Sequence, residues 1–125
     1  MDSQLFRVMM VGMEEQVWQP LAKVEGLPLL GGEGRFRLLE RAAGGLAYLI
    51  HYPAGVSSPP HAHDHDSIVY VLSGRLRGTV YGVDAVLEPG DSAVHPRGVE
   101  HCVEALTDAM WVEFKSPLPE RPPIA

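Results

Sequence analysis

The chain has 125 residues, 46% of them hydrophobic, which suits one compact domain with its own core but not two. Its formal net charge is -6 and its Lys and Arg residues form no cluster, so neither nucleic acid nor an anionic membrane surface is an expected partner. No run approaches the roughly 20 apolar residues of a membrane span. The first residues lack a signal-peptide pattern, and the single cysteine cannot form a disulfide within the chain, so a reducing, cytoplasmic setting is expected.

Glycine and proline interrupt the chain every several residues, and the segments between them are short and rich in Val, Leu, Ile and Tyr. This pattern is typical of an all-β fold, because no long stretch has the period of an amphipathic helix. The expected strands cover residues 35–42, 45–52, 67–74, 75–82, 84–89, 91–96, 100–106 and 108–115. Small or apolar residues alternate with polar or aromatic ones in 75–82, as in a half-exposed antiparallel strand. We therefore expect an antiparallel β-barrel or sandwich.

The C-terminal segment differs in composition from the rest of the chain. Residues 117–125 contain four prolines, which cannot pair as a central strand. We expect one barrel domain over residues 1–116, with an N-terminal strand arm, followed by an extended proline-rich tail on the surface or on a neighbouring subunit.

Three histidines stand at alternate positions directly before an apolar run, in the stretch HAHDHDSIVYVLSG. Because alternate side chains of an extended segment point the same way, His61 and His63 can share one metal ion, and His65 follows in the same register. A further histidine, His101, comes later in the chain, just after a turn shaped by Pro96 and Gly98. If the two segments are neighbours, three imidazoles converge, a ligand set that suits Fe, Zn, Ni, Cu and Mn.

Two segments of the chain resemble the two sequence motifs of the cupin superfamily, in its small single-domain form. The first motif joins a glycine to His-x-His and a second glycine, and the second motif joins a glycine to Pro-x-Gly and a histidine. The matching positions here are Gly55, His61, His63 and Gly74 for the first motif, and Gly90, Pro96, Gly98 and His101 for the second. The resemblance extends over roughly residues 45–114.

This resemblance implies a jelly-roll barrel of two facing antiparallel sheets that binds a metal ion inside through His61, His63 and His101. It also implies a homodimer that pairs or exchanges edge strands, which here would use residues 4–11 and would cover an exposed edge.

The chain departs from the cupin pattern at the position of the metal-binding glutamate, where it has Ser67. The direct interpretation is a three-histidine site. A one-residue bulge would bring Asp66 into the vacant position, and Ser67 or water are the other candidates to complete the metal's ligands. Cupins often carry a histidine at the position of His65 that does not bind metal, so His65 is placed beside the site.

The leading functional hypothesis is a metal-dependent enzyme acting on a small organic molecule, of the non-haem iron dioxygenase type. Some three-histidine cupins that resemble this pattern oxidise thiols or diketones. Iron is the first choice of metal, with Zn, Ni or Mn as alternatives. Two other functions stay open: a cupin that binds or senses a small ligand without turning it over, and an isomerase or lyase in which the ion acts only as a Lewis acid.

Other polar and aromatic residues receive structural interpretations. His95 is expected to pack or hydrogen-bond at the mouth of the site. Most of the aromatic residues are expected to fill the core, and most of the acidic residues near the motifs to be solvated. The aromatic residues are Tyr48, Tyr70, Trp111 and Phe114, and the acidic residues are Asp64, Asp66, Glu100 and Glu104.

Overall fold

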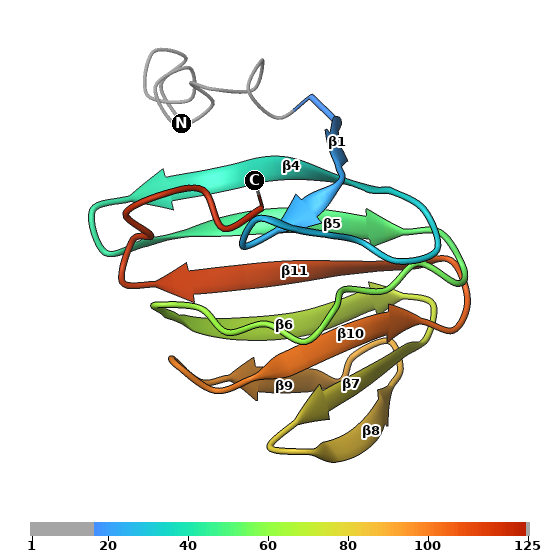
Figure 1. Cartoon of the computed structure of the whole chain (residues 1–125). Helices are drawn as coiled ribbons and strands as arrows, with labels where there is room; N and C mark the ends of the chain where they lie inside the picture. The colour runs from blue at the N-terminus through green and yellow to red at the C-terminus, as the bar shows by residue number, and fades with distance from the viewer. Residues whose placement is uncertain (1–16, 125) are drawn as a thin grey trace.

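The computed structural model describes residues 17–124, and every regular element in that range is a β-strand (Figure 1). The strands are β1 (Gln19–Leu21), β2 (Lys23–Val24), β3 (Leu27–Pro28), β4 (Gly34–Ala42), β5 (Gly45–Tyr52), β6 (Asp66–Ser73), β7 (Leu76–Val80), β8 (Val83–Leu87), β9 (Ser92–His95), β10 (His101–Ala105) and β11 (Ala109–Ser116). The prediction of an all-β fold is confirmed. Within the described residues, no helix is long and apolar enough to cross a bilayer.

The strands β4 to β11 correspond to the eight strands predicted from the sequence, and each end lies within two residues of its predicted position. The short strands β1, β2 and β3 were not predicted, because two or three residues between proline and glycine carry no readable period. The strand expected over residues 4–11 lies outside the described residues.

Two antiparallel sheets form the jelly roll. The larger sheet has the order β1-β4-β5-β11-β6-β9 and the smaller has the order β10-β7-β8, while β2 and β3 form a separate hairpin. Figure 1 shows the smaller sheet beside β6 and β9. The segment before β6 runs antiparallel to β10: the N–H of Gly55 donates to the carbonyl of Ala105 at 2.9 Å, and the N–H of His61 donates to that of His101 at 3.0 Å. This pairing places the first cupin motif against the second.

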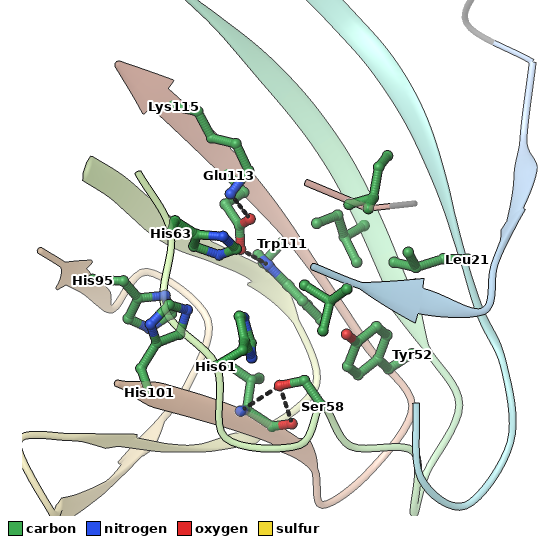
Figure 2. Close-up of a pocket in the computed structure, with 14 residues that line it drawn as sticks. Leu21, Tyr52, Ser58, His61, His63, His95, His101, Trp111, Glu113 and Lys115 are labelled. Atoms are coloured by element: carbon green, nitrogen blue, oxygen red, sulfur yellow. Dashed lines mark hydrogen bonds and ion pairs between the residues drawn. The ribbon is translucent and has the colours of Figure 1, made fainter. Parts of the chain in front are cut away.

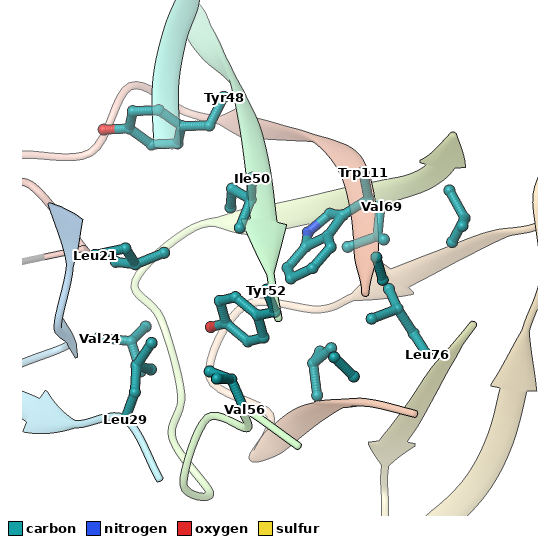
Figure 3. Close-up of a cluster of buried hydrophobic side chains, with 14 residues drawn as sticks. Leu21, Val24, Leu29, Tyr48, Ile50, Tyr52, Val56, Val69, Leu76 and Trp111 are labelled. Atoms are coloured by element: carbon teal, nitrogen blue, oxygen red, sulfur yellow. The ribbon is translucent and has the colours of Figure 1, made fainter. Parts of the chain in front are cut away.

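The hydrophobic core lies between the two sheets (Figure 3). Alternate residues of the strands supply it, since successive side chains of a strand point to opposite faces. Val69 and Trp111 come from the larger sheet, and Leu76 and Val103 from the smaller one. Tyr52 packs edge-on against Trp111 with ring centroids 4.7 Å apart. One end of this interior is polar, and that end holds the histidines.

The proline-rich tail runs along the surface through residues 120–122, which are exposed, and then turns its last residues into the domain. Pro123 is fully buried, and its carbonyl accepts a hydrogen bond from the N–H of Glu25 at 2.6 Å. Ile124 reaches the cavity beside the histidines. The tail packs inward because its last residues offer apolar surface that the barrel can remove from water.

Candidate metal centre

Three histidine side chains from the two motif segments converge inside the barrel (Figure 2). His61 ends the segment beside β10, His63 follows two residues later, and His101 begins β10. The backbones of His61 and His101 exchange two hydrogen bonds, of 3.0 and 2.9 Å, which fix the two segments to each other. One ligand nitrogen from each of the three rings lies within 4.8 Å of the others. The structure thus brings together the three histidines that the sequence spacing selected.

Each of the three rings has an acceptor oxygen at Nδ1. The distances are 2.7 Å from His61 to the carbonyl of Pro59, 3.1 Å from His101 to the carbonyl of Val99, and 2.8 Å from His63 to Oε1 of Glu25. A neutral imidazole that faces an acceptor at Nδ1 carries its hydrogen there, which leaves the lone pair of Nε2 free. Metal-binding histidines in proteins are held in this way, by an oxygen on the ring nitrogen that does not bind the metal.

Burial keeps the three rings neutral. His61, His63 and His101 are between 3% and 8% exposed. Loss of hydration lowers the pKa of all three, to about 2 for His63 and about 3 for His101. Because only a neutral imidazole can bind a metal, the rings are ready as ligands at neutral pH. The donor set therefore fits a divalent transition metal ion, without selecting among Fe, Zn, Ni and Mn.

The structure groups none of the three additional ligand candidates with these histidines. Nε2 of His65 accepts a hydrogen bond from Nζ of Lys115 at 3.1 Å, and Oγ of Ser67 accepts another at 2.9 Å. Asp66 is exposed, and its Oδ1 accepts a hydrogen bond from the N–H of Arg97 at 2.8 Å. These contacts engage all three side chains with groups other than the three-histidine cluster.

A buried lysine lies beside Ser67, where the cupin pattern has its glutamate. Lys115 is opposite Ser67 in the pairing of β11 with β6, and its side chain is 1% exposed. Besides His65 and Ser67, its ammonium group contacts Oε2 of Glu113 at 2.8 Å. An ammonium group has three hydrogens, so these three acceptors satisfy it completely. Lys115 is therefore a fixed, fully hydrogen-bonded positive charge inside the barrel.

Glu113 is the buried carboxylate of this site. It lines the same cavity as the three histidines, and its Oε1 accepts a hydrogen bond from Nε1 of Trp111 at 3.2 Å (Figure 2). Burial is the largest single effect and by itself raises the pKa of Glu113, but the charge of Lys115, its hydrogen bond to the carboxylate and the neighbouring histidines together outweigh burial and hold that pKa below its usual range. Glu113 is therefore ionised at neutral pH.

Sequence reasoning missed Glu113, Lys115 and Glu25. A signal for the first two was present in β11, where Ala109, Trp111, Glu113 and Lys115 share one face and the first two of them are apolar. Charged residues on the apolar face of a strand point to an interior polar site. No comparable signal marks Glu25, because it lies in the turn between two strands too short to recognise.

His95 lies against the cluster, as expected for a packing role. Its ring stacks on that of His101 with centroids 4.0 Å apart, and the residue is 2% exposed. The cavity between these rings and Glu113 has a volume of about 20 Å³, enough for one water molecule or one ion.

Among the remaining candidates, Trp111 lines the cavity at the histidines, and the other aromatic and acidic candidates do not. Tyr48 and Trp111 belong to the core as expected, whereas Tyr70 and Phe114 are exposed and do not fill it. Core filling was the wrong interpretation for these two, because they stand on the outer-facing positions of β6 and β11. Of the acidic candidates, Asp64, Asp66 and Glu100 are exposed and Glu104 is half-buried.

Residues 48–114, more than half of the chain, match the family described as Cupin domain. The chain belongs to the cupin family. An RmlC-like cupin from Shewanella frigidimarina is 31% identical and superposes with a TM-score of 0.68, covering 73% of this chain and 82% of that one. KdgF from Halomonas sp. is 27% identical with a TM-score of 0.67, covering 70% of this chain and 81% of that one.

One curated relative adds a sequence match. Dimethylsulfoniopropionate lyase DddQ from Ruegeria pomeroyi is 36% identical over 56 residues, which is 44% of this chain. The match covers only 28% of the length of that relative.

Proposed function

We propose that this cupin is a metal-dependent enzyme that binds a divalent transition metal ion through Nε2 of His61, His63 and His101 and acts on a small organic acid or carbonyl compound. The observation that carries the proposal is the state of the three rings, each buried, neutral and fixed at Nδ1 by an oxygen. Three neutral rings held in this way, with a nitrogen of each within 4.8 Å of the others, form the kind of ligand set that binds a transition metal ion.

The reaction class that the side chains favour is proton transfer, as in a lyase or an isomerase. The metal supplies Lewis-acid activation of a bound carboxylate or carbonyl oxygen. Glu113 lines the same cavity, and its pKa is held below its usual range, so it is an ionised but weak base. A weak base accepts a proton only from an acidified carbon or hydroxyl, which limits the substrate to acids and carbonyl compounds. The partial similarity to a relative named as a lyase supports this class.

Lys115 and Trp111 position the base in this mechanism. Lys115 holds Oε2 of Glu113 at 2.8 Å and Trp111 holds Oε1 at 3.2 Å. Two donors on opposite oxygens prevent rotation of the carboxylate and keep it charged in a buried place. Neither donor needs to touch the substrate.

A dioxygenase is the second candidate, because the cluster of possible ligands found in residues 17–124 contains no carboxylate. Three neutral donors leave the full charge of an Fe ion to attract a chelating anionic substrate, with positions left over for O₂. The two candidates differ in one measurable property, which is the need for oxygen.

The test is to load the purified protein with Fe, Mn, Zn or Ni and to add a panel of 2-keto acids, 2-hydroxy acids and diketones with and without O₂. Proton transfer predicts deuterium incorporation from D₂O, seen by NMR, in the absence of O₂, and its loss in Glu113→Gln. Oxygen uptake that needs the substrate would favour the dioxygenase. If every compound is bound and released unchanged, the protein is a binding or sensing cupin and the enzyme proposal is wrong.

Metal binding is tested separately from turnover. The loaded protein should contain about one ion per chain and unfold at a higher temperature than the metal-free protein, because the ion binds only the folded state. His101→Ala should abolish this rise, whereas His51→Ala, which removes a half-buried histidine outside the three-histidine cluster, should keep it. A rise that survives in His101→Ala would place the metal elsewhere.

We also propose that the functional form is a homodimer. The outer face of the larger sheet exposes Val94, Ile68 and Phe114, which lie side by side across β9, β6 and β11, with Tyr70 and Leu72 next to them on β6. A row of large apolar side chains on one sheet face is typical of an interface. Light scattering should give twice the mass of the chain, and Ile68→Lys should return it to the monomer mass.

A further inference from the structure

A second cavity, separate from the cavity of about 20 Å³ at the histidines, opens between the smaller sheet and β6 and β9. Its volume is about 260 Å³. The side chains around it are aliphatic, and none of its lining residues is acidic or basic apart from a single histidine. The principal ones are Val69, Leu76, Val80, Val83, Leu87 and Val103. We call this cavity the aliphatic cleft.

The cleft exists because a glycine stands where the sheet would present a side chain. Gly78 is buried on the inward face of β7, and a Cβ built on it would meet no atom within 4 Å. Its partner across β8 is Ala85, the next smallest residue. A glycine in the middle of a strand weakens the strand, and one with open space above it often marks the approach of a ligand.

The aliphatic cleft borders the metal centre. His95 and Val103 line both cavities, and the ring of His95 stacks on that of His101. His95 is 2% exposed, and its Nδ1 has no hydrogen-bond partner among the described residues. A buried imidazole nitrogen without a partner is costly, so a ligand that lies along the ring and offers it a polar atom would remove that cost.

From this juxtaposition we propose that the cleft binds the aliphatic body of the substrate while the substrate's carboxylate or carbonyl end lies at His61, His63 and His101. The inference rests on the proposed metal-dependent function and names its substrate class, which is a small acid or carbonyl compound with an alkyl chain or ring of about four to six carbons. An apolar cavity of about 150 Å³ is already enough to take up benzene. A polyhydroxylated body is disfavoured, since its hydroxyl groups would leave water for a wall with almost no hydrogen-bonding partners.

The experiment compares three ligands that share one chelating end, a 2-hydroxycarboxylate. Lactate has a short body, 2-hydroxyhexanoate adds three methylene groups, and gluconate has six carbons with a hydroxyl group on each carbon of its body. Titration calorimetry of the metal-loaded protein should show 2-hydroxyhexanoate binding at least about tenfold more tightly than lactate, from about two- to fourfold per buried methylene. Gluconate should not share that gain.

Two variants fill the cleft. Gly78→Val adds side-chain volume at the open position, and Ala85→Leu does so from the neighbouring strand. Each should bring the affinity for 2-hydroxyhexanoate down to that for lactate, leave lactate binding unchanged, and leave the unfolding temperature no lower than in the wild type. Thr79→Val is the matched control, because Thr79 follows Gly78 on β7 and points to the other face of the strand. It should retain the full chain-length gain.

Metal analysis of the same samples separates the possible failures. A metal-loaded protein that binds 2-hydroxyhexanoate no better than lactate, or that keeps the gain in both filled variants, overturns the assignment of the cleft alone. A protein that takes up no metal overturns the proposed function, and with it the position assigned to the polar end of the substrate.

Discussion

Replacing Lys115 by methionine tests the buried network that Lys115 forms with Glu113, His65 and Ser67. Ser67 is the residue at the position of the cupin glutamate. Methionine has nearly the same length, so Lys115→Met removes the charge and three hydrogen-bond donors while keeping most of the packing. The change leaves the carboxylate of Glu113, which is 8% exposed, with one donor, the indole of Trp111. It also leaves His65 and Ser67 without the donor that each has at present.

The expected loss of unfolding free energy follows from the burial of the Lys115–Glu113 ion pair. Removing one partner of a buried ion pair typically costs about 3–5 kcal/mol, because an uncompensated charge is left behind. Glu113→Gln should offset part of this cost, since it removes the stranded charge and still offers an oxygen to Trp111. The double variant should therefore be more stable than the sum of the two single effects by at least about 1.5 kcal/mol.

The assay is urea denaturation of the metal-free protein at pH 7, with the free energy of unfolding taken from the linear extrapolation. Arg77→Met serves as the control, because it breaks the exposed pair with Glu104 at 3.1 Å and should cost less than about 1 kcal/mol. The loss of unfolding free energy in Lys115→Met should also become smaller as the pH falls from 7 to 5. Without Lys115, burial raises the pKa of Glu113, and protonation then removes its charge. A cost as small as that of Arg77→Met, or additive effects in the double variant, would refute the reasoning.

Three further predictions concern the histidines and one turn. Glu25→Gln should weaken metal affinity about 10–100-fold with little change in fold, because it alters the hydrogen bond that orients His63. A competition titration with a metal chelator measures the affinity, and an unchanged affinity would contradict the prediction. Burial lowers the pKa of His63 to about 2 and that of His101 to about 3, from the ordinary histidine value of 6.5, so below pH 6.5 the unfolded chain binds protons that the folded protein does not. The free energy of unfolding of the metal-free protein should therefore decrease from pH 6.5 toward pH 3, and a flat or rising profile would be inconsistent with neutral buried rings. Gly74→Ala should lower stability by more than about 2 kcal/mol, because φ is +76° and a Cβ would lie 2.0 Å from the carbonyl oxygen of Asp108; an unchanged unfolding midpoint would exclude this contact.

The fold could be predicted from local pattern because strands β4 to β11 are bounded by glycine or proline and contain apolar residues at the right period. The three histidines could be selected because the two motifs fix their spacing, and the pairing of His61 with His101 brings those motifs together. Parity along a strand also gave the two faces of β7, with Leu76 and Gly78 inward and Arg77 outward.

The charged residues of the site, Glu113, Lys115 and Glu25, could not be predicted from the sequence pattern, and the cause is physical. Charged residues are assumed to be solvated unless a partner is known, and two of the three partners of Lys115, Ser67 on β6 and His65 just before it, are distant in sequence. The position of Glu25 depends on a turn between two very short strands and on the contact of that turn with Pro123. Both depend on tertiary contacts that a local pattern does not contain.

The proposal that three imidazoles hold one ion is tested most directly by an anomalous-scattering map of crystals grown from metal-loaded protein. We expect a single strong peak about 2.0–2.3 Å from Nε2 of His61, His63 and His101, at the absorption edge of a first-row transition metal. A peak bound to other residues, or no peak among these three rings, would contradict it.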